Sequence, residues 1–319
     1  MSRILFHLNS ISERGTTTAA LEYAEELAKL GNLISFAYDA NDKSNNRLFM
    51  EKIALLYPMF PYVEFRESMK LYEQNFDFSY YLKSGENDKK LINGIPNYVH
   101  VVFQNYDPHG DKYAFVSRWL AEEMQRKYPL ESANHFEWVP HIVNMPNPRA
   151  NLRSHLGIPD TAICGIRIGG QDSFDINFVM KLVAKLVSKK DYYFIFVNTK
   201  KFIDSPNVIF LKTIFDKQLK SDLLATADYF LHARAMGESF GVSIVEAMQV
   251  GIPVFAWEGG VDKNHLRLLP KEMLYSSAHD LKAKIVNCRS FSTTANRIAS
   301  DEFRPDIVME KFLNVFPMG

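Results

Sequence analysis

The sequence predicts an α/β protein made of two doubly wound domains, in which helices cover both faces of a parallel sheet. Residues 3–38 and 162–198 each carry the pattern strand, glycine-containing loop, helix, strand, although they lie far apart in the chain. A length of 319 residues is typical of two domains rather than one. Residues 139–149 contain three prolines and no apolar periodicity, so the linker is expected there. The predicted domains are 1–145 and 146–300.

Composition and charge narrow the class of protein. Hydrophobic residues make up 47% of the chain, enough for two cores, and a formal net charge of zero argues against a general nucleic-acid binder. The two cysteines, Cys164 and Cys288, are too few for a disulfide framework and favour a reducing compartment. No apolar run is long enough to cross a bilayer, and the first residues enter a strand without a signal peptide. A cytoplasmic protein without a transmembrane segment is expected; peripheral membrane contact and oligomeric state stay open.

The first domain begins with an apolar strand at 3–8, followed by a loop whose single glycine is Gly15. Thr16 or Thr17 is expected to cap the next helix, because a threonine hydroxyl can accept a bond from an early helical amide. Ligands of open α/β sheets bind outside the carboxyl ends of the strands, where this loop lies. The remaining predicted elements are a helix at 17–30, a strand at 32–38, a helix at 47–57, short strands at 62–65 and 76–81, a solvated loop at 84–90, strands at 97–104 and 112–116, and a helix at 118–127 capped by Ser117.

Two groups of side chains in this domain leave a choice between packing and function. The aromatic residues between 57 and 81 are expected to pack in the core rather than form a surface that stacks on sugars or touches a membrane. His100 lies within a strand and is expected to be a satisfied core residue, whereas His109 lies in a loop at the edge of the sheet. His109 is therefore the candidate for a functional histidine. The alternative is a turn histidine bonded to Asp107 or Asp111.

The most informative stretch, 228–260, joins a strand, a polar loop, a helix and a second strand. The loop contains Glu238, and a helix is expected at 242–249, where apolar residues are available for burial. Gly251 ends this helix in the usual C-terminal way, and the next short strand starts at Pro253.

The junction of this loop and helix suits an anion such as a diphosphate. The first backbone amides of a helix have no partner within it and lie at the positive end of its dipole. Ser239, Phe240 and Gly241 lead into those amides, and Gly241 allows close approach because it has no Cβ. Glu238 precedes this site and Glu246 is expected two helical turns beyond it, since eight helical residues span about 12 Å. The two carboxylates are thus expected to reach both ends of a nucleotide diphosphate sugar.

The segment GESFGVSIVEAMQVGIPV at 237–254 resembles the Glu-x7-Glu signature of retaining glycosyltransferases of the GT-B fold, specifically the large family 4 type. This resemblance implies two Rossmann-like domains that face a cleft, with the donor on the second domain and the acceptor on the first. It also implies that Glu238 contacts the donor sugar, that the Phe240 and Gly241 backbone contacts the sugar phosphate, and that Glu246 holds the ribose hydroxyls. The neighbouring residues assigned to the same donor site are Arg234, Ser239 and Val242.

The loop after the first strand of the second domain is the other expected part of the donor site. In family 4 this loop usually supplies an arginine and a nearby lysine to the diphosphate; Arg167 is the arginine, but the lysine is absent. The amides of Gly169 and Gly170 are expected to compensate as an anion nest, and Lys212 is a second candidate cation. The predicted elements of this half are strands at 162–168, 192–198, 208–211, 228–232 and 253–256, helices at 176–188, 216–226 and 265–269, and a terminal helix at 301–316, within a segment 301–319 that is expected to pack back on the first domain.

The resemblance also assigns positions in the first domain. Family 4 enzymes usually have a glycine-rich loop that faces the acceptor and the donor phosphates, which assigns Gly15 to the donor site. They often place a histidine near the acceptor. The positional match here is Gln104 or Asn105, so His109, a few residues on, is assigned that role.

Together these features predict transfer of a sugar from a nucleotide-diphosphate sugar to an acceptor hydroxyl with retention of configuration, in glycan or glycoconjugate synthesis. No carboxylate is placed as a covalent nucleophile, so attack on the face of the leaving group is expected, with Arg167 and the helix amides stabilising the diphosphate. No metal or other cofactor is expected. The alternatives are a non-catalytic protein that binds nucleotide sugars or glycans, or another activity of the same fold, such as a sugar-nucleotide epimerase or a phosphorylase. A phosphorylase would need a lysine for pyridoxal phosphate, and none lies in a recognisable site.

Overall fold

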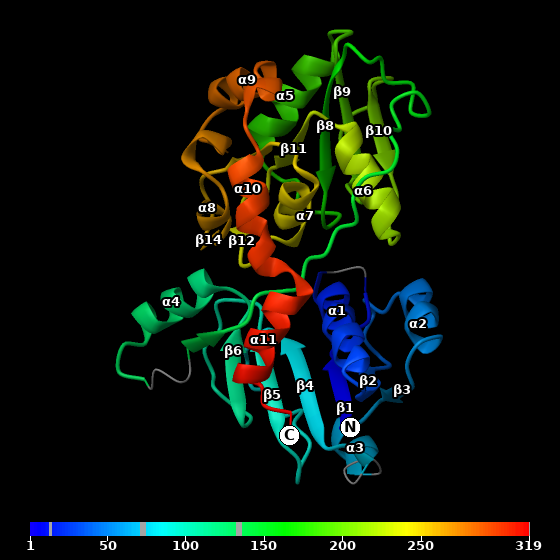
Figure 1. The fold of residues 1–319 in the computed structure, drawn as a ribbon, viewed down its shortest axis with the longest axis vertical. Coiled ribbons are helices and arrows are strands. Elements are labelled where there is room, and N and C mark those ends of the chain that lie inside the picture. Colours follow the sequence, from blue (N-terminus) through cyan, green and yellow to red (C-terminus); the bar gives the residue numbers. More distant parts are fainter. Residues whose placement is uncertain (13–14, 71–74, 132–135, 319) are drawn as a thin grey trace. The chain divides into compact units, whose positions relative to one another are not determined.

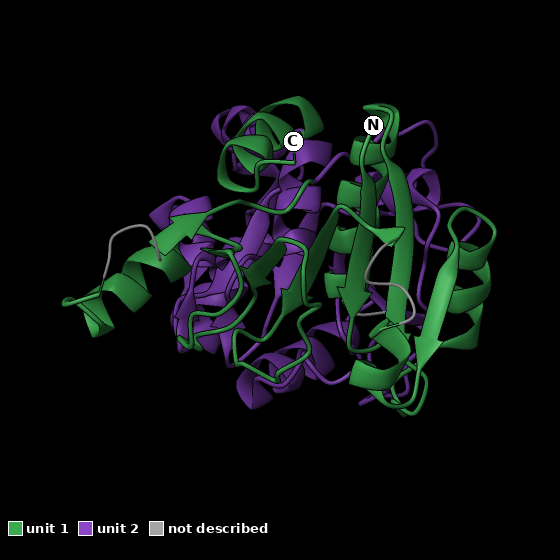
Figure 2. Cartoon of the chain, turned by 90° about the horizontal axis from the view of Figure 1, so that it is seen from below, with its two compact units in different colours: residues 1–142, 305–319 green, residues 143–304 purple. Residues whose placement is uncertain are grey.

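The chain folds into two compact α/β units, each with a parallel sheet, as the sequence predicts. Unit 1 comprises Met1–Ile142 together with Pro305–Gly319, and unit 2 comprises Val143–Arg304. Figure 2 colours the two units separately. The computed structural model describes residues 1–12, 15–70, 75–131 and 136–318.

Within the described residues, unit 1 is built on a seven-stranded sheet with the order β3-β2-β1-β4-β5-β6-β7. Its central strands are apolar and buried along almost their whole length, which is typical of a parallel sheet covered on both faces (Figure 1). The strands are β1 (Arg3–Leu8), β2 (Leu33–Asp39), β3 (Met59–Tyr62), β4 (Phe78–Lys83), β5 (Asn97–Val101), β6 (Lys112–Phe115) and β7 (Glu137–Trp138). The helices are α1 (Gly15–Lys29), α2 (Arg47–Ala54), α3 (Phe65–Lys70), α4 (Arg118–Lys127) and α11 (Pro305–Val315).

The terminal helix α11 packs on the sheet of unit 1 through aromatic side chains. The ring of Phe312 lies 4.8 Å from that of Tyr23 and 5.4 Å from that of Tyr80, and the ring of Phe316 lies 5.7 Å from that of Tyr98. Each aromatic pair stabilises the contact beyond the area that it buries. The sequence pattern predicts one helix at 301–316, but the backbone forms a 3₁₀ turn at Ser300–Phe303 and starts α11 at Pro305, because proline suits a first helical position.

Unit 1 corrects two further expectations and confirms one. Thr16 and Thr17 lie inside α1 rather than at its cap, and the Thr17 hydroxyl accepts a hydrogen bond from the Ser12 amide instead. The strand expected at 62–65 ends at Tyr62, after which Phe65 and Met69 bury one face of α3. Ser117 caps α4 as predicted, with its hydroxyl accepting from the Leu120 amide.

The loop at 84–90 is exposed to solvent at 86–89, as predicted, and it is also tied to the carboxyl edge of the sheet. Asp88 forms an ion pair with Lys83, whose side chain is only 3% exposed. Lys90 forms an ion pair with Asp39 and donates a hydrogen bond to the Tyr62 hydroxyl. The charged residues of this loop therefore combine exposure to solvent with ion pairs inside the unit.

Within the described residues, unit 2 has a six-stranded parallel sheet with the order β10-β9-β8-β11-β13-β15. In chain order this is third, second, first, fourth, fifth, sixth, the doubly wound Rossmann order, and the first six strands of unit 1 follow the same order. The strands are β8 (Ile163–Ile168), β9 (Tyr192–Val197), β10 (Val208–Leu211), β11 (Tyr229–His232), β13 (Val254–Trp257) and β15 (Leu274–Tyr275), with a separate short pair β12 (Gly237–Glu238) and β14 (Asp262–Lys263). The helices are α5 (Asn177–Val187), α6 (Lys217–Thr226), α7 (Val242–Val250), α8 (His265–Leu268), α9 (Ala278–Val286) and α10 (Thr294–Ala299).

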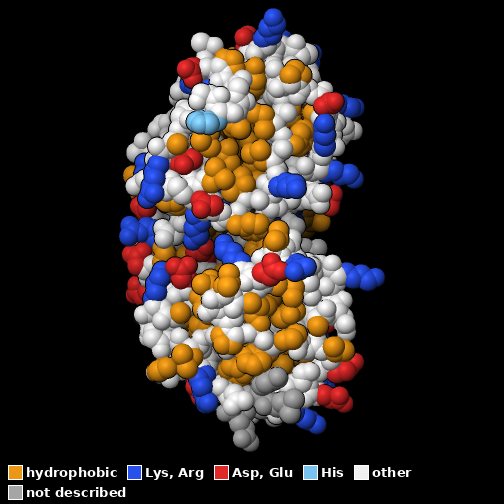
Figure 3. Space-filling view, turned by 90° about the vertical axis from the view of Figure 1, so that its right-hand side faces the viewer, with side chains coloured by type: hydrophobic (Ala, Val, Ile, Leu, Met, Phe, Trp, Pro, Cys, Tyr) orange, Lys and Arg blue, Asp and Glu red, His pale blue; other side chains and the backbone are white. Residues whose placement is uncertain are grey.

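Apolar side chains also reach the surface, and Figure 3 shows them gathered on the face of the molecule that it presents. In unit 1, Leu48 on α2 is 67% exposed, and Leu55 and Leu56 just after this helix are 86% and 64% exposed. None of the described helices is both long enough and apolar enough to pass through a bilayer.

Candidate functional site

The carboxyl edge of the sheet in unit 2 gathers the loops that follow β8 and β11. These two strands are neighbours in the sheet, where Tyr229 pairs with Gly165 and Phe230 with Ile166. From β8 the chain winds toward one edge of the sheet, and from β11 it winds toward the other. Such a topological switch point is where open α/β sheets hold their ligands.

Glu238 lies in this region with both carboxylate oxygens held by the protein. His232 Nε2 lies 3.1 Å from Oε1, and Arg234 Nη1 donates to Oε2 at 3.1 Å. Burial acts to raise the pKa of Glu238, but the hydrogen bond from His232 and the nearby positive charge of Arg234 outweigh it, so the pKa is lowered. The side chain is therefore a carboxylate at neutral pH, fixed in orientation and 18% exposed.

The backbone around Glu238 is fixed by a glycine that cannot be replaced without rearrangement. Gly237 has φ +80°, and a Cβ at this position would lie 1.9 Å from the backbone oxygen of Asp262. The close approach belongs to the short parallel pair of β12 and β14, and the Asn264 amide also donates to the Glu238 carbonyl at 3.0 Å. The sequence pattern predicted an irregular loop here and missed this pairing.

The amino end of α7 follows and lacks a side-chain cap. Gly241, the cap residue, has φ +99°, and its carbonyl accepts from the amides of Ile244 and Val245. Val242 is the first helical residue, as expected, so the earliest amides of α7 remain suited to an anion. Phe240 anchors the loop, because its ring is buried against that of Phe303.

Glu246 lies closer to this helix end than the sequence analysis predicted. The helix begins at Val242, as expected, so Glu246 is the fifth helical residue and lies about 6 Å along the axis from the first. The eight residues counted from Glu238 are therefore not all helical. The Glu246 carboxylate accepts a hydrogen bond from Lys220 Nζ of α6 at 2.7 Å. Sequence reasoning missed Lys220, because nothing in the local pattern links two helical residues that are 26 positions apart.

Arg167 has a different role from the one predicted. It is 4% exposed, and its guanidinium donates to carbonyls and hydroxyls of the protein, with Asn198 and Thr199 on one side and Gly170 and Ser173 on the other. Burial lowers the pKa of Arg167 to about 10, so it remains charged at neutral pH. Arg167 therefore fastens the loops after β8 and β9 to each other.

The glycines beside Arg167 make this arrangement possible, whereas Lys212 lies elsewhere. A Cβ on Gly169 would lie 2.7 Å from Arg167 Nη2, so the loop can close over the guanidinium only with glycine there. Gly170 is exposed and uses its carbonyl to accept from Arg167. Lys212 is exposed after β10, the outermost strand, which β9 and β8 separate from β11. The structure does not group it with Glu238.

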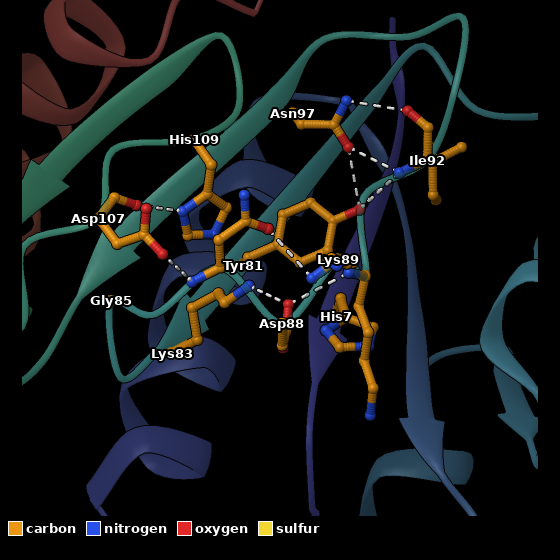
Figure 4. Close-up of polar contacts among 12 residues, drawn as sticks. His7, Tyr81, Lys83, Gly85, Asp88, Lys89, Ile92, Asn97, Asp107 and His109 are labelled. Carbon is orange, nitrogen blue, oxygen red and sulfur yellow. Dashed lines mark hydrogen bonds and ion pairs between the residues drawn. The ribbon is translucent and has the colours of Figure 1, made fainter.

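Of the two candidate positions of unit 1, Gly15 follows β1 at the carboxyl edge of the sheet. His109 precedes β6 and lies two residues before Asp111, whose amide donates to the carbonyl of Asn97 at the start of β5. Gly15 is the exposed first residue of α1. His109 is 9% exposed, and its Nδ1 lies 2.6 Å from the backbone oxygen of Asp107 (Figure 4). A carbonyl only accepts, so Nδ1 carries the proton and Nε2 has a free lone pair. Burial lowers the pKa of His109, which favours this neutral form, and Nε2 has no protein partner among the described residues.

His100, by contrast, is the core residue that the sequence predicts. Its Nε2 donates to the Val139 carbonyl at 2.8 Å, and the Tyr80 hydroxyl donates to its Nδ1 at 2.6 Å. Both ring nitrogens are thus occupied.

Known proteins resemble this chain in part of its sequence and in its fold. Residues 185–262 match the model of the family described as glycosyl transferases group 1. A search of the curated proteins finds no match. Among solved structures, Alr3699/HepE from Anabaena in complex with UDP-glucose superposes with a TM-score of 0.75 at 16% identity, covering 99% of both chains. A glycosyltransferase from Rickettsia africae gives 0.70 at 13% identity, covering 99% of this chain and 97% of that one. Sucrose-phosphate synthase from Thermosynechococcus elongatus gives 0.69 at 14% identity, covering 99% and 98%.

The fold is GT-B.

Within this GT-B chain, the matched segment runs from the end of α5 to β14. It contains Lys220, Glu238 and Glu246, but neither Arg167 nor His109. The residues that the sequence analysis assigned with the motif therefore lie in the matched part, and the roles of the other two depend on the geometry alone.

Proposed function

We propose that the protein is a retaining glycosyltransferase that moves a sugar from a nucleotide-diphosphate donor to the hydroxyl of an acceptor, in glycan or glycoconjugate synthesis. The observation that carries this proposal is the carboxylate of Glu238, held at both oxygens beside the uncapped amides of α7. A carboxylate accepts from sugar hydroxyls, and helix amides bind phosphate oxygens. A complex of the structurally similar HepE contains UDP-glucose, a ligand with both groups.

Each unit then has its own task. Unit 2 holds the donor, with Glu238 on the sugar, the α7 amides on the diphosphate and Glu246 on the ribose. Arg167 supports the loops at this site rather than meeting the phosphates directly. In unit 1, His109 is assigned to the acceptor side, and its buried Nε2 is the ring nitrogen without a protein partner among the described residues. The amides stabilise the charge that develops on the leaving diphosphate, and the acceptor attacks from the same face without a metal.

The decisive experiment compares the wild type with Glu238→Gln on a panel of UDP, GDP and ADP sugars, with simple sugars and oligosaccharides as acceptors. The amide keeps the size of the side chain but loses an ionised acceptor, so kcat/KM is expected to fall by about 100-fold to 1,000-fold. Glu272→Gln, at an exposed position of the same unit, is the matched control. NMR of the product reports whether the configuration is retained, and EDTA tests the expected independence of metal. Unchanged transfer by Glu238→Gln would contradict the proposal.

One observation favours a second candidate, a protein of this fold that binds nucleotide sugars without transferring them. Arg167, the expected cation for the diphosphate, is engaged by protein groups. A thermal-shift screen with the same nucleotides detects binding, because a ligand of the folded state raises Tm by mass action. Binding without turnover of any donor would support this candidate, and donor isomerisation without acceptor would support an epimerase.

A further inference from the structure

His232 lies directly behind Glu238 and is fixed on several sides. It is the last residue of β11 and is 5% exposed. Its backbone carbonyl accepts from the Tyr275 hydroxyl at 2.8 Å, and its ring centroid lies 5.4 Å from that of His265. The ring of His265 is held in turn, because its Nε2 donates to the Trp257 carbonyl at 2.8 Å. The imidazole of His232 therefore has little freedom to turn.

The imidazole of His232 has one hydrogen-bond partner among the described residues, the Glu238 carboxylate. The Glu238 carboxylate can only accept, so His232 Nε2 carries the proton that lies between them. His232 Nδ1 is buried and has no hydrogen-bond partner in the described part of the chain. The ring thus makes a single polar contact, and it is to Glu238. A buried polar ring with an unsatisfied nitrogen is less favourable than an apolar side chain of similar size, so packing alone does not explain a histidine here.

The two groups that hold Glu238 differ in rigidity. The Arg234 side chain is 30% exposed and long, whereas the His232 side chain is 5% exposed and wedged against His265. Each takes one carboxylate oxygen, and a carboxylate offers about four lone-pair directions in all. Each carboxylate oxygen therefore keeps a lone pair for a further hydrogen bond. The direction of these lone pairs is set by the rigid imidazole.

We infer that His232 is a positioning residue, which orients the Glu238 carboxylate for the hydroxyls of the donor sugar. This inference rests on the proposed function. The inference predicts different effects on recognition of the sugar and of the nucleotide. The α7 amides are proposed to contact the diphosphate and Glu246 the ribose, and neither contact uses an atom of His232. Loss of the imidazole is therefore expected to weaken recognition of the sugar and to spare recognition of the nucleotide.

The test uses the full chain with two substitutions, His232→Phe and His232→Gln. Phenylalanine fills the space without a donor, and glutamine can place an amide N–H near the position of Nε2. Affinities for UDP and UDP-glucose are measured by calorimetry, followed by the GDP and ADP pairs, and kcat and KM are measured with the donor that the wild type uses. His279, an exposed histidine of α9 in the same unit, provides the matched controls His279→Phe and His279→Gln.

The expected result is selective. His232→Phe should bind the free nucleotide within about twofold of the wild type, lose the added affinity for the sugar nucleotide, and reduce kcat/KM by about 100-fold. His232→Gln should recover most of that loss, and the His279 controls should match the wild type. Full retention of the preference for the sugar nucleotide by His232→Phe would overturn the inference. Equal losses in both His232 variants, or an equal loss for nucleotide and sugar nucleotide, would also overturn it, because they indicate a structural role. A wild type without turnover or preference for any sugar nucleotide would overturn the proposed function as well.

Discussion

The two sheets of this protein share one strand order, yet their carboxyl edges are used in different ways. In unit 1, charged side chains at the edge find partners within the unit, as in the ion pairs of Lys83 with Asp88 and of Lys90 with Asp39. In unit 2, glycines at the edge allow close turns, and the amino end of α7 has no side-chain cap. The comparison teaches that the fold supplies a place for a site, and the loop residues decide whether that place is filled from within.

His109 of unit 1 differs from these charged side chains. Its Nε2 has no protein partner among the described residues, although charged groups lie nearby (Figure 4). At the edge of unit 2, by contrast, Glu238 and Glu246 are both held by named donors before any ligand binds. We expect such preorganised carboxylates to lose little on binding, because their orientation is already set.

The largest difference between the units should appear when a methyl group is added to a glycine. Gly237→Ala must adopt a positive φ with its Cβ against the Asp262 carbonyl, and we expect a loss of about 3 kcal/mol in unfolding free energy. Gly15→Ala in unit 1 meets nothing within 4 Å and lies in a helix, so stability should stay the same or rise. Thermal unfolding of both variants checks this. Equal melting temperatures would show that β12 can shift to make room.

Acid should weaken unit 1 more than unit 2. In unit 1, burial lowers the pKa of His7 to about 3 and that of His100 to about 4, and it also lowers the pKa of His141 strongly. In unit 2, burial lowers the pKa of His265 to about 4. These folded-state values lie below the unfolded value of about 6.5, so stability is lost as pH falls from 6.5 toward the folded pKa. At pH 5 each shifted histidine should remove about 2 kcal/mol.

Hydrogen exchange at pH 7 and pH 5, corrected for intrinsic rates, measures this difference separately for each unit. Amides of β4 and β5 should lose more protection than those of β11 and β13. A greater loss in unit 2 would contradict the prediction, since it would mean that groups other than these histidines govern the response to acid.

A smaller effect separates two partly buried ion pairs, one from each unit. Lys83→Met leaves the Asp88 carboxylate without its partner and should reduce stability by about 2 kcal/mol, less than for a fully buried pair because the Asp88 side chain is 27% exposed. Lys220→Met removes the partner of Glu246 and should reduce stability similarly, but it should also weaken nucleotide binding. Denaturation by urea and calorimetry with UDP distinguish the two. Weaker UDP binding in Lys83→Met alone would reverse the comparison.

The sequence determined the elements and most of their order. Apolar runs and caps located β1, β8, β10, α4 and α6 to within a residue or two, because burial on both faces and N-cap hydrogen bonds leave local signals. The prediction of a doubly wound α/β chain is confirmed by both sheets. The motif at 237–254 also marked Glu238 and the glycine-led start of α7, since close approach and a positive φ both call for glycine there.

Only the tertiary structure decided which groups hold one another. The sequence analysis assigned Arg167 to the diphosphate of the donor. In the structure its hydrogen-bond partners come from two loops that follow different strands. His232, Lys220 and the pairing of β12 with β14 left no local pattern, because hydrogen bonds and ion pairs between distant segments depend on where the sheet brings them together. Secondary structure can be predicted from periodicity and caps, because a single stretch of chain satisfies both. The orientation of the Glu238 carboxylate is set by neighbours that meet only once the chain has folded.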